Sequence, residues 1–310
     1  MPSMAGIAAA NNVEEAAGGP VGRVCTLVNV SNWEPSAEAY NVLLGMISEK
    51  EKNRIKKFRF PIDAHRSLLG RLLIRDCVEE NIGRHFPGVR KPVLTRTSHN
   101  KPIVNMLECA NIVSQDKKRF NFNVSHHGSW VASTFHNSRI VGVDVMKYER
   151  PKGCKDLGEY FRLMKSSFLE KEWKLIRGSG NEKNQLVSFY RFWALKESYI
   201  KAVGVGLGLK LDRLEFFFDD GVQPHQATKA HARLDGQPLS SWEFVIFEPD
   251  EAHCIVVGTG PWEHADDEFG KHFPPFEKVH SDDQAQGQGQ WEFLTVAAED
   301  YASKVLNRGI

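Results

Sequence analysis

Residues Gln185–Val203 show the strongest helical pattern in the chain, and Gly204 follows them as a C-cap. Within this predicted helix Trp193, Glu197 and Lys201 recur at every fourth position and therefore share one face. On exposed helices a Glu–Lys pair at this spacing is common and contributes about 0.2–0.5 kcal/mol. The tryptophan on the same stripe indicates a partly buried face, where a carboxylate and an ammonium group need partners. A metal ion and a diphosphate would be such partners.

Strand and helix patterns occur in both halves of the chain, which predicts an α+β fold. The predicted strands are Val24–Val30, Phe120–Val124, Trp130–Phe135, Ile140–Val145, Leu214–Phe218, Trp242–Phe247 and His253–Gly258. The other predicted helices are Ser36–Phe58, Ile62–Glu80, Asp156–Met164 and Leu169–Arg177, and Trp291–Leu306 is a candidate terminal element.

Composition divides the chain into four segments. Residues 1–22 form a predicted flexible leader, and residues 263–310 a polar linker with an acidic tail. Between them we place an N-terminal part at residues 23–138 and a C-terminal part with the metal site at residues 139–262. No signal-peptide pattern and no apolar run of about 18 residues occurs, so we expect no membrane partner. The five cysteines include no CxxC pair, which is typical of reduced thiols in a cytoplasmic protein.

Charge is balanced overall but uneven along the chain. The net charge of +1 gives no reason to expect a nucleic-acid partner. Basic residues outnumber acidic ones over Ser48–Lys101, and this stretch includes Arg54, Arg96 and Lys101. A solvated helix face explains such a block as well as a site for an anionic ligand does. The polar segment Arg96–Lys101 precedes Pro102 and is predicted to be a loop that could wrap a phosphate or a base.

Two short segments carry further candidate site residues. In the predicted strand at residues 140–145, Gly142 and Asp144 face away from the valines, so a carboxylate lies beside a glycine that permits close approach. An aspartate that begins a turn is the alternative. In Asn123-Val-Ser-His-His127 the two histidines point to opposite faces of a strand, so they do not chelate one metal. One of them could donate to a phosphate, although a lone histidine is often structural.

Five motifs in order resemble those of the 4′-phosphopantetheinyl transferases, of the larger surfactin-synthetase-activating type and its animal-type branch. They are Arg96…Lys101-Pro102, Asn123-Val-Ser-His126, Gly142-Val-Asp144, Phe168…Glu172-Trp173 and Trp193-Ala-Leu-Lys-Glu-Ser198…Lys201. The resemblance runs from about Val24 to Gly258. It implies two similar lobes related by a pseudo-twofold axis, with coenzyme A in the cleft between them. It also implies a monomer that moves phosphopantetheine from coenzyme A to a serine of apo acyl carrier proteins or carrier domains, with Mg²⁺.

The resemblance also implies a role for each matching residue. Asp144 and Glu197 would bind Mg²⁺, and Glu197, Lys201 and His126 would be catalytic. Glu197 would deprotonate the carrier serine, while Lys201 and His126 would bind the diphosphate. Arg54 would lie near the 3′-phosphate. The remaining predicted contacts to coenzyme A are Arg96, Thr97, Ser98, His99, Asn100, Lys101, Asn123, Val124 and Ser125.

The sequence departs from the family pattern at two positions. Many relatives carry a glutamate two residues after the aspartate, where this chain has Met146. Because a thioether is too soft for Mg²⁺, water must complete the metal shell. Animal-type relatives often have glutamine at the position of His127, so we hypothesise that His127 makes metal or phosphate binding pH-sensitive. Two other activities remain open: an inactive binder of carrier proteins, and a coenzyme A acyltransferase that needs no metal.

Overall fold

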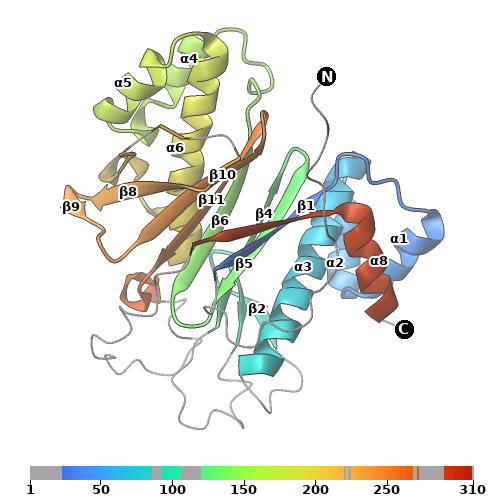
Figure 1. The fold of residues 1–310 in the computed structure, drawn as a ribbon. Helices are drawn as coiled ribbons and strands as arrows, with labels where there is room; N and C mark the ends of the chain where they lie inside the picture. The colour runs from blue at the N-terminus through green and yellow to red at the C-terminus, as the bar shows by residue number, and fades with distance from the viewer. Residues whose placement is uncertain are drawn as a thin grey trace, which may run out of the picture.

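The computed structural model of the protein describes residues 23–85, 93–105, 120–219, 221–222, 225–267, 271 and 290–308. The predicted leader and most of the predicted polar linker lie outside these residues. Within them, helices and β-sheets occur in both halves of the chain, which confirms the predicted mixture of the two (Figure 1). Among the described helices, none combines the length and the apolar character needed to cross a membrane.

Two main β-sheets form the centre of the fold (Figure 1). The first sheet has the strand order β12 (Glu292–Ala297), β1 (Val24–Asn29), β5 (Trp130–His136) and β4 (Asn121–His127). The second has the order β6 (Ile140–Lys147), β11 (His253–Gly260), β10 (Glu243–Asp250), β8 (Thr228–Leu234) and β7 (Leu214–Phe217), and β9 (Gln237–Pro238) pairs with β8. A small separate sheet pairs β2 (Leu94–Arg96) with β3 (Pro102–Val104).

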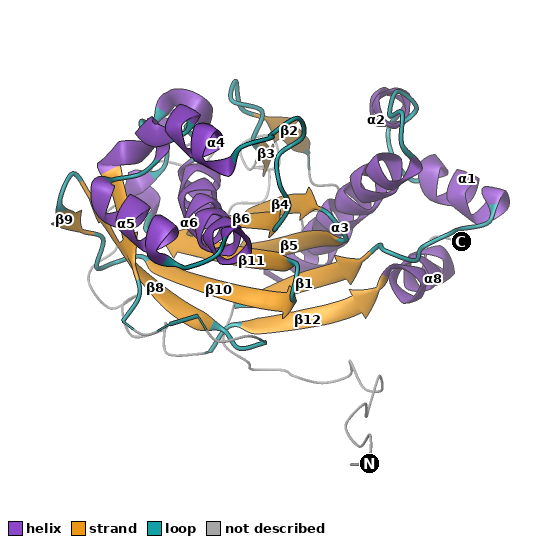
Figure 2. Cartoon of the chain, turned by 90° about the horizontal axis from the view of Figure 1, so that it is seen from above, coloured by secondary structure: helices purple, strands orange, loops and turns teal. Residues whose placement is uncertain are grey.

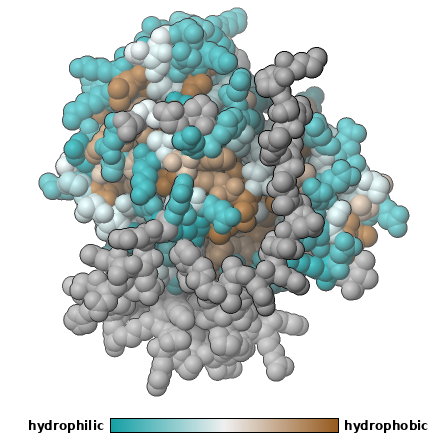
Figure 3. All heavy atoms as spheres, in the orientation of Figure 1, coloured by the Kyte–Doolittle hydropathy of each residue, from teal (hydrophilic) through white to brown (hydrophobic). Residues whose placement is uncertain are grey.

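Two groups of helices cover the sheets on one side, as Figure 2 shows from above. The first group is α1 (Ala37–Gly45), α2 (Glu49–Ile55), α3 (Pro61–His85) and α8 (Ala298–Arg308), and the second is α4 (Leu157–Leu163), α5 (Glu170–Gly178) and α6 (Glu182–Val203). Helix α3 packs against β4 and β5, and α6 packs against β6 and β11. On the face seen in Figure 3, hydrophobic residues gather in the middle, with hydrophilic residues around them.

The predicted helix Ser36–Phe58 is wrong as a single element, because α1 ends at Gly45 and α2 begins at Glu49. Ser48 causes the break. Its side chain accepts a hydrogen bond from the backbone of Glu51, and the carboxylate of Glu51 accepts one from the backbone of Ser48. This capping box starts a new helix, and its Ser-x-x-Glu pattern is visible in the sequence.

The remaining predicted strands and helices are confirmed, with ends shifted by a few residues. The candidate terminal element is in fact a strand followed by a helix. Strand β12 runs parallel to β1, and the Tyr301 hydroxyl on α8 donates to Asp76 on α3 at 2.8 Å. Strands β2, β3, β8 and β9 were not predicted.

Side chains, not backbone pairs, join β4 to β6 where the two main sheets meet. Residue numbers rise together along both strands, and every second side chain of β4 accepts a backbone N–H of β6. The acceptors Asn121, Asn123, Ser125 and His127 bind the N–H groups of Val141, Val143, Val145 and Lys147 at 2.7, 2.9, 3.2 and 3.0 Å. We call this row of contacts the seam. Because side chains span the seam, no backbone ladder joins β4 to β6.

A second link joins the sheets at one end of the seam. The backbone N–H of Ser129, in the β4–β5 turn, donates to His253 Nε2 at 3.2 Å. Trp130 Nε1 donates to Asp250 Oδ2 at 2.7 Å, and Asp250 also contacts His253 Nδ1 at 2.8 Å. The seam and this link together fix the position of one sheet against the other.

Candidate active site

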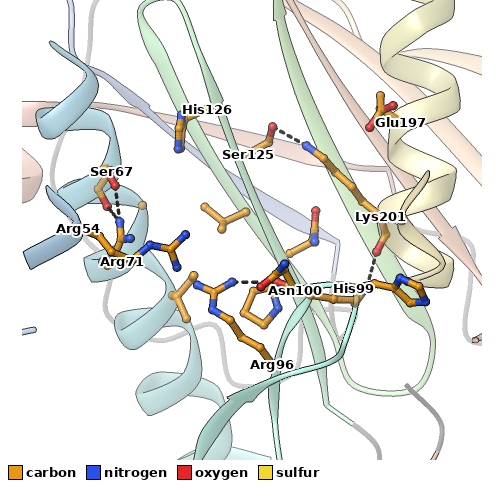
Figure 4. A pocket seen from close by; sticks show the side chains of 18 of the residues that line it. Arg54, Ser67, Arg71, Arg96, His99, Asn100, Ser125, His126, Glu197 and Lys201 are labelled. Atoms are coloured by element: carbon orange, nitrogen blue, oxygen red, sulfur yellow. Dashed lines mark hydrogen bonds between the residues drawn. The ribbon is translucent and has the colours of Figure 1, made fainter. Parts of the chain in front are cut away.

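A cavity of about 750 Å³ opens beside the seam, and its wall comes from both halves of the chain. Helices α2 and α3, the β2–β3 turn, strand β4 and the end of α6 all contribute to it (Figure 4). This volume lies within the range of ordinary small-molecule and cofactor sites. Eleven of the fourteen predicted site residues line it: Arg54, Arg96, His99, Asn100, Lys101, Asn123, Val124, Ser125, His126, Glu197 and Lys201.

At one end of the cavity an ammonium group binds a carboxylate and a hydroxyl. Lys201 Nζ lies 2.5 Å from Asp144 Oδ1 and 2.8 Å from Ser125 Oγ. Ser125 donates its own proton to Asp144 Oδ1 at 3.1 Å. Asp144 is only 4% exposed and is not part of the cavity wall, yet it contacts two residues that are. Its other oxygen, Oδ2, is buried and has no hydrogen-bond partner among the described residues.

Gly142 explains how Asp144 comes so close to α6. A Cβ atom at this position would lie 2.1 Å from the carbonyl oxygen of Ser198 and 2.4 Å from the backbone nitrogen of Ala202. Both atoms belong to the backbone of α6, so no side-chain movement could relieve the clash. The prediction that this glycine permits a close approach is therefore confirmed, and the approaching group is the helix itself.

Glu197 lies one helical turn before Lys201 and is half-buried. Burial raises the pKa of its carboxyl group, the negative charge of Asp144 raises it further, and Lys201 opposes both. The two carboxylates are thus near enough to repel each other. Trp193, on the same stripe, packs on Phe189 with ring centroids 6.1 Å apart, which confirms that this face of the helix is partly buried.

The donor set at this end fits a divalent cation of the Mg²⁺ type. Two neighbouring carboxylates raise each other's affinity for positive charge, and the unpartnered Oδ2 of Asp144 is an oxygen of the kind Mg²⁺ prefers. No group of three or more His, Cys, Asp or Glu side chains with metal-binding geometry occurs among the described residues. Further ligands of such an ion would be water or ligand oxygens.

Lys101 lines the cavity, but its ammonium group is also bound to the backbone of the fold. Its ammonium group is buried and donates to the backbone carbonyl of Ala202 at 3.0 Å, to that of Val141 at 3.4 Å, and to that of Lys201. Burial, and then the charge of Lys201, lowers its pKa to about 7. Lys101 thus caps the last carbonyls of α6 and ties them to β6.

The turn between β2 and β3 presents some predicted residues to the cavity and hides others. Thr97 is buried and closes the turn, because its hydroxyl accepts the N–H of Lys101 at 3.2 Å. Thr97 and Ser98 do not line the cavity, whereas His99 and Asn100 do. Arg96 donates to the carbonyl of Asn100 at 2.8 Å, which holds its guanidinium at the cavity wall (Figure 4).

The two adjacent histidines of β4 point to opposite faces, as predicted. His126 lines the cavity with its side chain exposed there. Partial desolvation by the surrounding wall, followed by the nearby Arg66 and Lys201, lowers its pKa to about 4. It is therefore a neutral hydrogen-bonding group near pH 7. His127 lies on the seam, where its Nδ1 accepts the N–H of Lys147, so that nitrogen is not available to a metal. Burial also lowers the pKa of His127, against a smaller opposing effect of Glu149.

Sequence analysis missed part of the cavity wall, mainly on α3. The missed residues include Phe58, Ser67, Gly70, Arg71, Ile74 and Ile200. Lys57 belongs to the basic block, which was a usable signal. No such signal marked the residues of α3, because an arginine or serine on an amphipathic helix is typical of a solvated face.

Comparison with known proteins matches both halves of the chain to one group of enzymes. Residues 31–136 match the family described as 4′-phosphopantetheinyl transferase, N-terminal, and residues 140–257 match the 4′-phosphopantetheinyl transferase superfamily. A phosphopantetheinyl transferase of Thraustochytrium sp. is 39% identical over 234 residues, which are 74% of this chain and 76% of that protein.

Two further relatives carry related names. The L-aminoadipate-semialdehyde dehydrogenase-phosphopantetheinyl transferase of Homo sapiens is 38% identical over 229 residues, 73% of this chain and 71% of that protein. The 4′-phosphopantetheinyl transferase ffp of Bacillus subtilis is 30% identical over 177 residues, 57% of this chain and 69% of that protein. The two family matches and these identities agree with the five sequence motifs, and the chain belongs to the 4′-phosphopantetheinyl transferase superfamily.

Proposed function

We propose that this chain transfers 4′-phosphopantetheine from coenzyme A to a serine of an apo acyl carrier protein or carrier domain. The serine oxygen forms a bond to the phosphorus nearest pantetheine, the bond from that phosphorus to the adenosine-side oxygen breaks, and adenosine 3′,5′-bisphosphate leaves. The observation that carries the proposal is the group Asp144, Ser125, Lys201 and Glu197 at one end of the cavity, in a chain of this superfamily.

Glu197 is the proposed base for the carrier serine. Its carboxylate lines the cavity, and a positioned general base typically contributes about 10²–10⁴-fold to a rate. The proton of the serine passes to Glu197 directly or through one water. Lys201 then faces the phosphate oxygens on which charge develops, and its ammonium group stabilises them. His126, neutral near pH 7, donates an N–H to the same diphosphate.

Asp144 and Glu197 are the proposed ligands of Mg²⁺, with water and phosphate oxygens in the other positions. The ion would neutralise the negative charge that builds on the diphosphate during transfer. Ser125 orients Asp144 through its hydroxyl and fixes the carboxylate to the seam.

The rest of the cavity is proposed to hold the adenosine end and the arm of coenzyme A. Arg54 and Arg96 would bind phosphate, because a guanidinium group matches phosphate oxygens in pairs. The proposed contacts along the ligand are His99, Asn100, Asn123 and Val124. Thr97, Ser98 and Lys101 would act through the shape of the turn and the end of α6.

The proposal extends to how the two halves of the chain are arranged. We propose that residues 23–138 and 139–262 are two similar lobes related by a pseudo-twofold axis, with the ligand between them. The seam and the two separate helical groups support this arrangement. We also propose a monomer in the cytoplasm. The free thiols of Cys25, Cys77, Cys154 and Cys254 support a reducing compartment.

The proposal is tested by weighing a carrier protein before and after reaction. Purified protein is incubated with coenzyme A and an apo acyl carrier protein, with Mg²⁺ or with EDTA, and the intact mass of the carrier is measured. We expect a gain of one phosphopantetheine group with Mg²⁺ and none with EDTA. Coenzyme A binding without any gain on several carriers would favour the inactive binder. Acyl transfer from acetyl-coenzyme A in EDTA would favour the metal-independent acyltransferase.

We expect that His127 causes no pH dependence of phosphopantetheine transfer between pH 6 and 8. Burial lowers its pKa from the ordinary 6.5, which favours the neutral ring whose Nδ1 accepts the N–H of Lys147. His127→Gln keeps an acceptor for the N–H of Lys147, and its profile of kcat against pH should match that of the wild type. A step in the wild-type profile that disappears in His127→Gln would instead support the pH-sensitive role hypothesised from the sequence.

A further inference from the structure

Lys201 is held in place at both its side chain and its backbone. Its ammonium group points from α6 toward Ser125 and Asp144 (Figure 4). Its backbone carbonyl accepts a hydrogen bond from the ammonium group of Lys101. Lys101 belongs to the β2–β3 turn, in the other half of the chain. A residue far away in the sequence therefore fixes the main chain from which the Lys201 side chain extends.

Lys101 binds two of the carbonyls that α6 leaves open at its end. Every α-helix ends with four backbone carbonyls that have no partner within the helix. At the end of α6 the carbonyls of Ile200 and Val203 accept backbone N–H groups at 2.8 and 2.9 Å. Lys101 Nζ donates to the two carbonyls between them, those of Lys201 and Ala202, the latter at 3.0 Å. A positive charge at this end also matches the helix dipole.

The same ammonium group reaches β6, at the point where this strand crosses α6. Lys101 Nζ lies 3.4 Å from the carbonyl oxygen of Val141. The next residue, Gly142, is where strand and helix touch, since a Cβ atom there would lie 2.1 Å from the carbonyl oxygen of Ser198. Asp144 follows two residues later on β6. Lys101 therefore bridges the strand that carries the carboxylate and the helix that carries its ammonium partner.

The burial of Lys101 shows how closely its charge is tied to these carbonyls. Lys101 is only 7% exposed, and a buried ammonium group is costly unless hydrogen bonds compensate it. An ammonium group has three N–H bonds, and the three carbonyl acceptors belong to the last turn of α6 and to β6. An apolar side chain could fill the same space, but it could not hold these two elements together by hydrogen bonds.

We infer that Lys101 is a positioning residue for Lys201, because it fixes the last turn of α6 against β6. The inference rests on the proposed function, in which Lys201 stabilises the charge that develops on the transferred phosphate. Lys101 needs no contact with the reacting atoms for this role. A displacement of a catalytic group by about 1 Å can lower a rate by about 100-fold.

The first test replaces Lys101 with methionine, which has a similar length and no donor. We expect kcat for carrier modification at saturating coenzyme A to fall by about 10- to 100-fold. The dissociation constant of coenzyme A, measured by calorimetry in EDTA, should stay close to the wild-type value. Lys101→Arg keeps the charge and the donors and should recover part of kcat. A weaker affinity for coenzyme A with an unchanged kcat would mean that Lys101 acts by binding the ligand, and would overturn the inference.

A double-mutant cycle shows whether Lys101 acts through Lys201. In a Lys201→Met background the further change Lys101→Met should lower kcat much less than in the wild type, because the side chain that it positions is gone. The same fold loss in both backgrounds would overturn the inference. Lys210→Met is the matched control, since Lys210 is exposed, lies beyond the end of α6 and does not line the cavity. It should leave kcat unchanged.

Hydrogen exchange measured by mass spectrometry gives a result that does not depend on transfer. In Lys101→Met we expect faster exchange of the amides in the last turn of α6 and unchanged exchange in α5. Equally faster exchange in both helices would mean that Lys101 only supports overall stability, and would overturn the inference.

The exchange experiment also separates this inference from the proposed function. If the wild type modified no carrier, faster exchange confined to the end of α6 in Lys101→Met would support the inference while the proposed reaction failed. If the wild type modified carriers and Lys101→Met kept both the wild-type kcat and the wild-type exchange, the reaction would stand and the inference would fail.

Discussion

Replacing Glu197 with glutamine is expected to lower kcat for carrier modification by about 10²–10⁴-fold, because an amide cannot accept the serine proton. The change keeps the shape of the side chain and removes its charge next to Asp144. Binding of the adenosine end should be little affected, since Arg54, Arg71 and Arg96 lie at the other end of the cavity. The measurement is the rate of carrier modification at saturating coenzyme A, together with the affinity for coenzyme A in EDTA.

Glu170→Gln is the control for this experiment. Glu170 is exposed in the first turn of α5, outside the cavity wall, and its replacement should leave kcat unchanged. Wild-type kcat in Glu197→Gln would show that the carboxylate is neither the base nor an essential metal ligand. The general base would then have to be sought elsewhere on the wall, with His126 as the next candidate.

Replacing Lys196 with methionine is expected to lower the free energy of unfolding by about 3–5 kcal/mol, the usual cost of breaking a buried ion pair. Lys196 Nζ lies 2.7 Å from Glu172 Oε2, and the two side chains are 0% and 1% exposed. The ammonium group also donates to the carbonyls of Leu211 and Leu214, at 2.9 and 2.5 Å. Methionine would leave a buried carboxylate without its cation and two carbonyls without a donor. Urea unfolding followed by circular dichroism measures the loss.

An exposed ion pair supplies the matched control for Lys196. Lys304 Nζ lies 3.9 Å from Glu80, and the two side chains are 49% and 40% exposed. Lys304→Met should therefore change the free energy of unfolding by less than about 1 kcal/mol. Adding Glu172→Gln to Lys196→Met should recover part of the loss, because no isolated charge would remain. Equal stability of Lys196→Met and the wild type would show that the pair is not needed to hold α5 against α6.

The sequence allowed the main elements of the fold to be predicted, because hydrophobic periodicity is local. The strand at residues 121–127 and the helix ending at Val203 are examples. The parallel pairing of β12 with β1 joins residues near opposite ends of the chain, and no local pattern carries such information. The seam could be predicted only in part. The alternating polar residues Asn121, Asn123 and Ser125 are visible in the sequence, but only the structure shows that they bind the backbone of β6.

The candidate site was predictable where its residues lie in motifs, and was missed where they lie on ordinary surfaces. The motif residues on β4, β6 and α6 come together because Gly142 allows β6 to touch α6. Arg71 was not predicted as a site residue because an arginine on a helix is usually solvated. Only the fold brings it beside Arg54 and Arg96. Lys101 lines the cavity, and its contact to the ligand stays a prediction; only the structure shows that its ammonium group binds the carbonyls at the end of α6.

The most direct test of the account is a crystal structure of the protein with coenzyme A and Mg²⁺. We predict that the diphosphate lies beside Lys201, that the ion contacts Asp144 and Glu197, and that the 3′-phosphate lies among Arg54, Arg71 and Arg96. Coenzyme A bound outside this cavity, or in it with the 3′-phosphate at Lys201, would contradict the account.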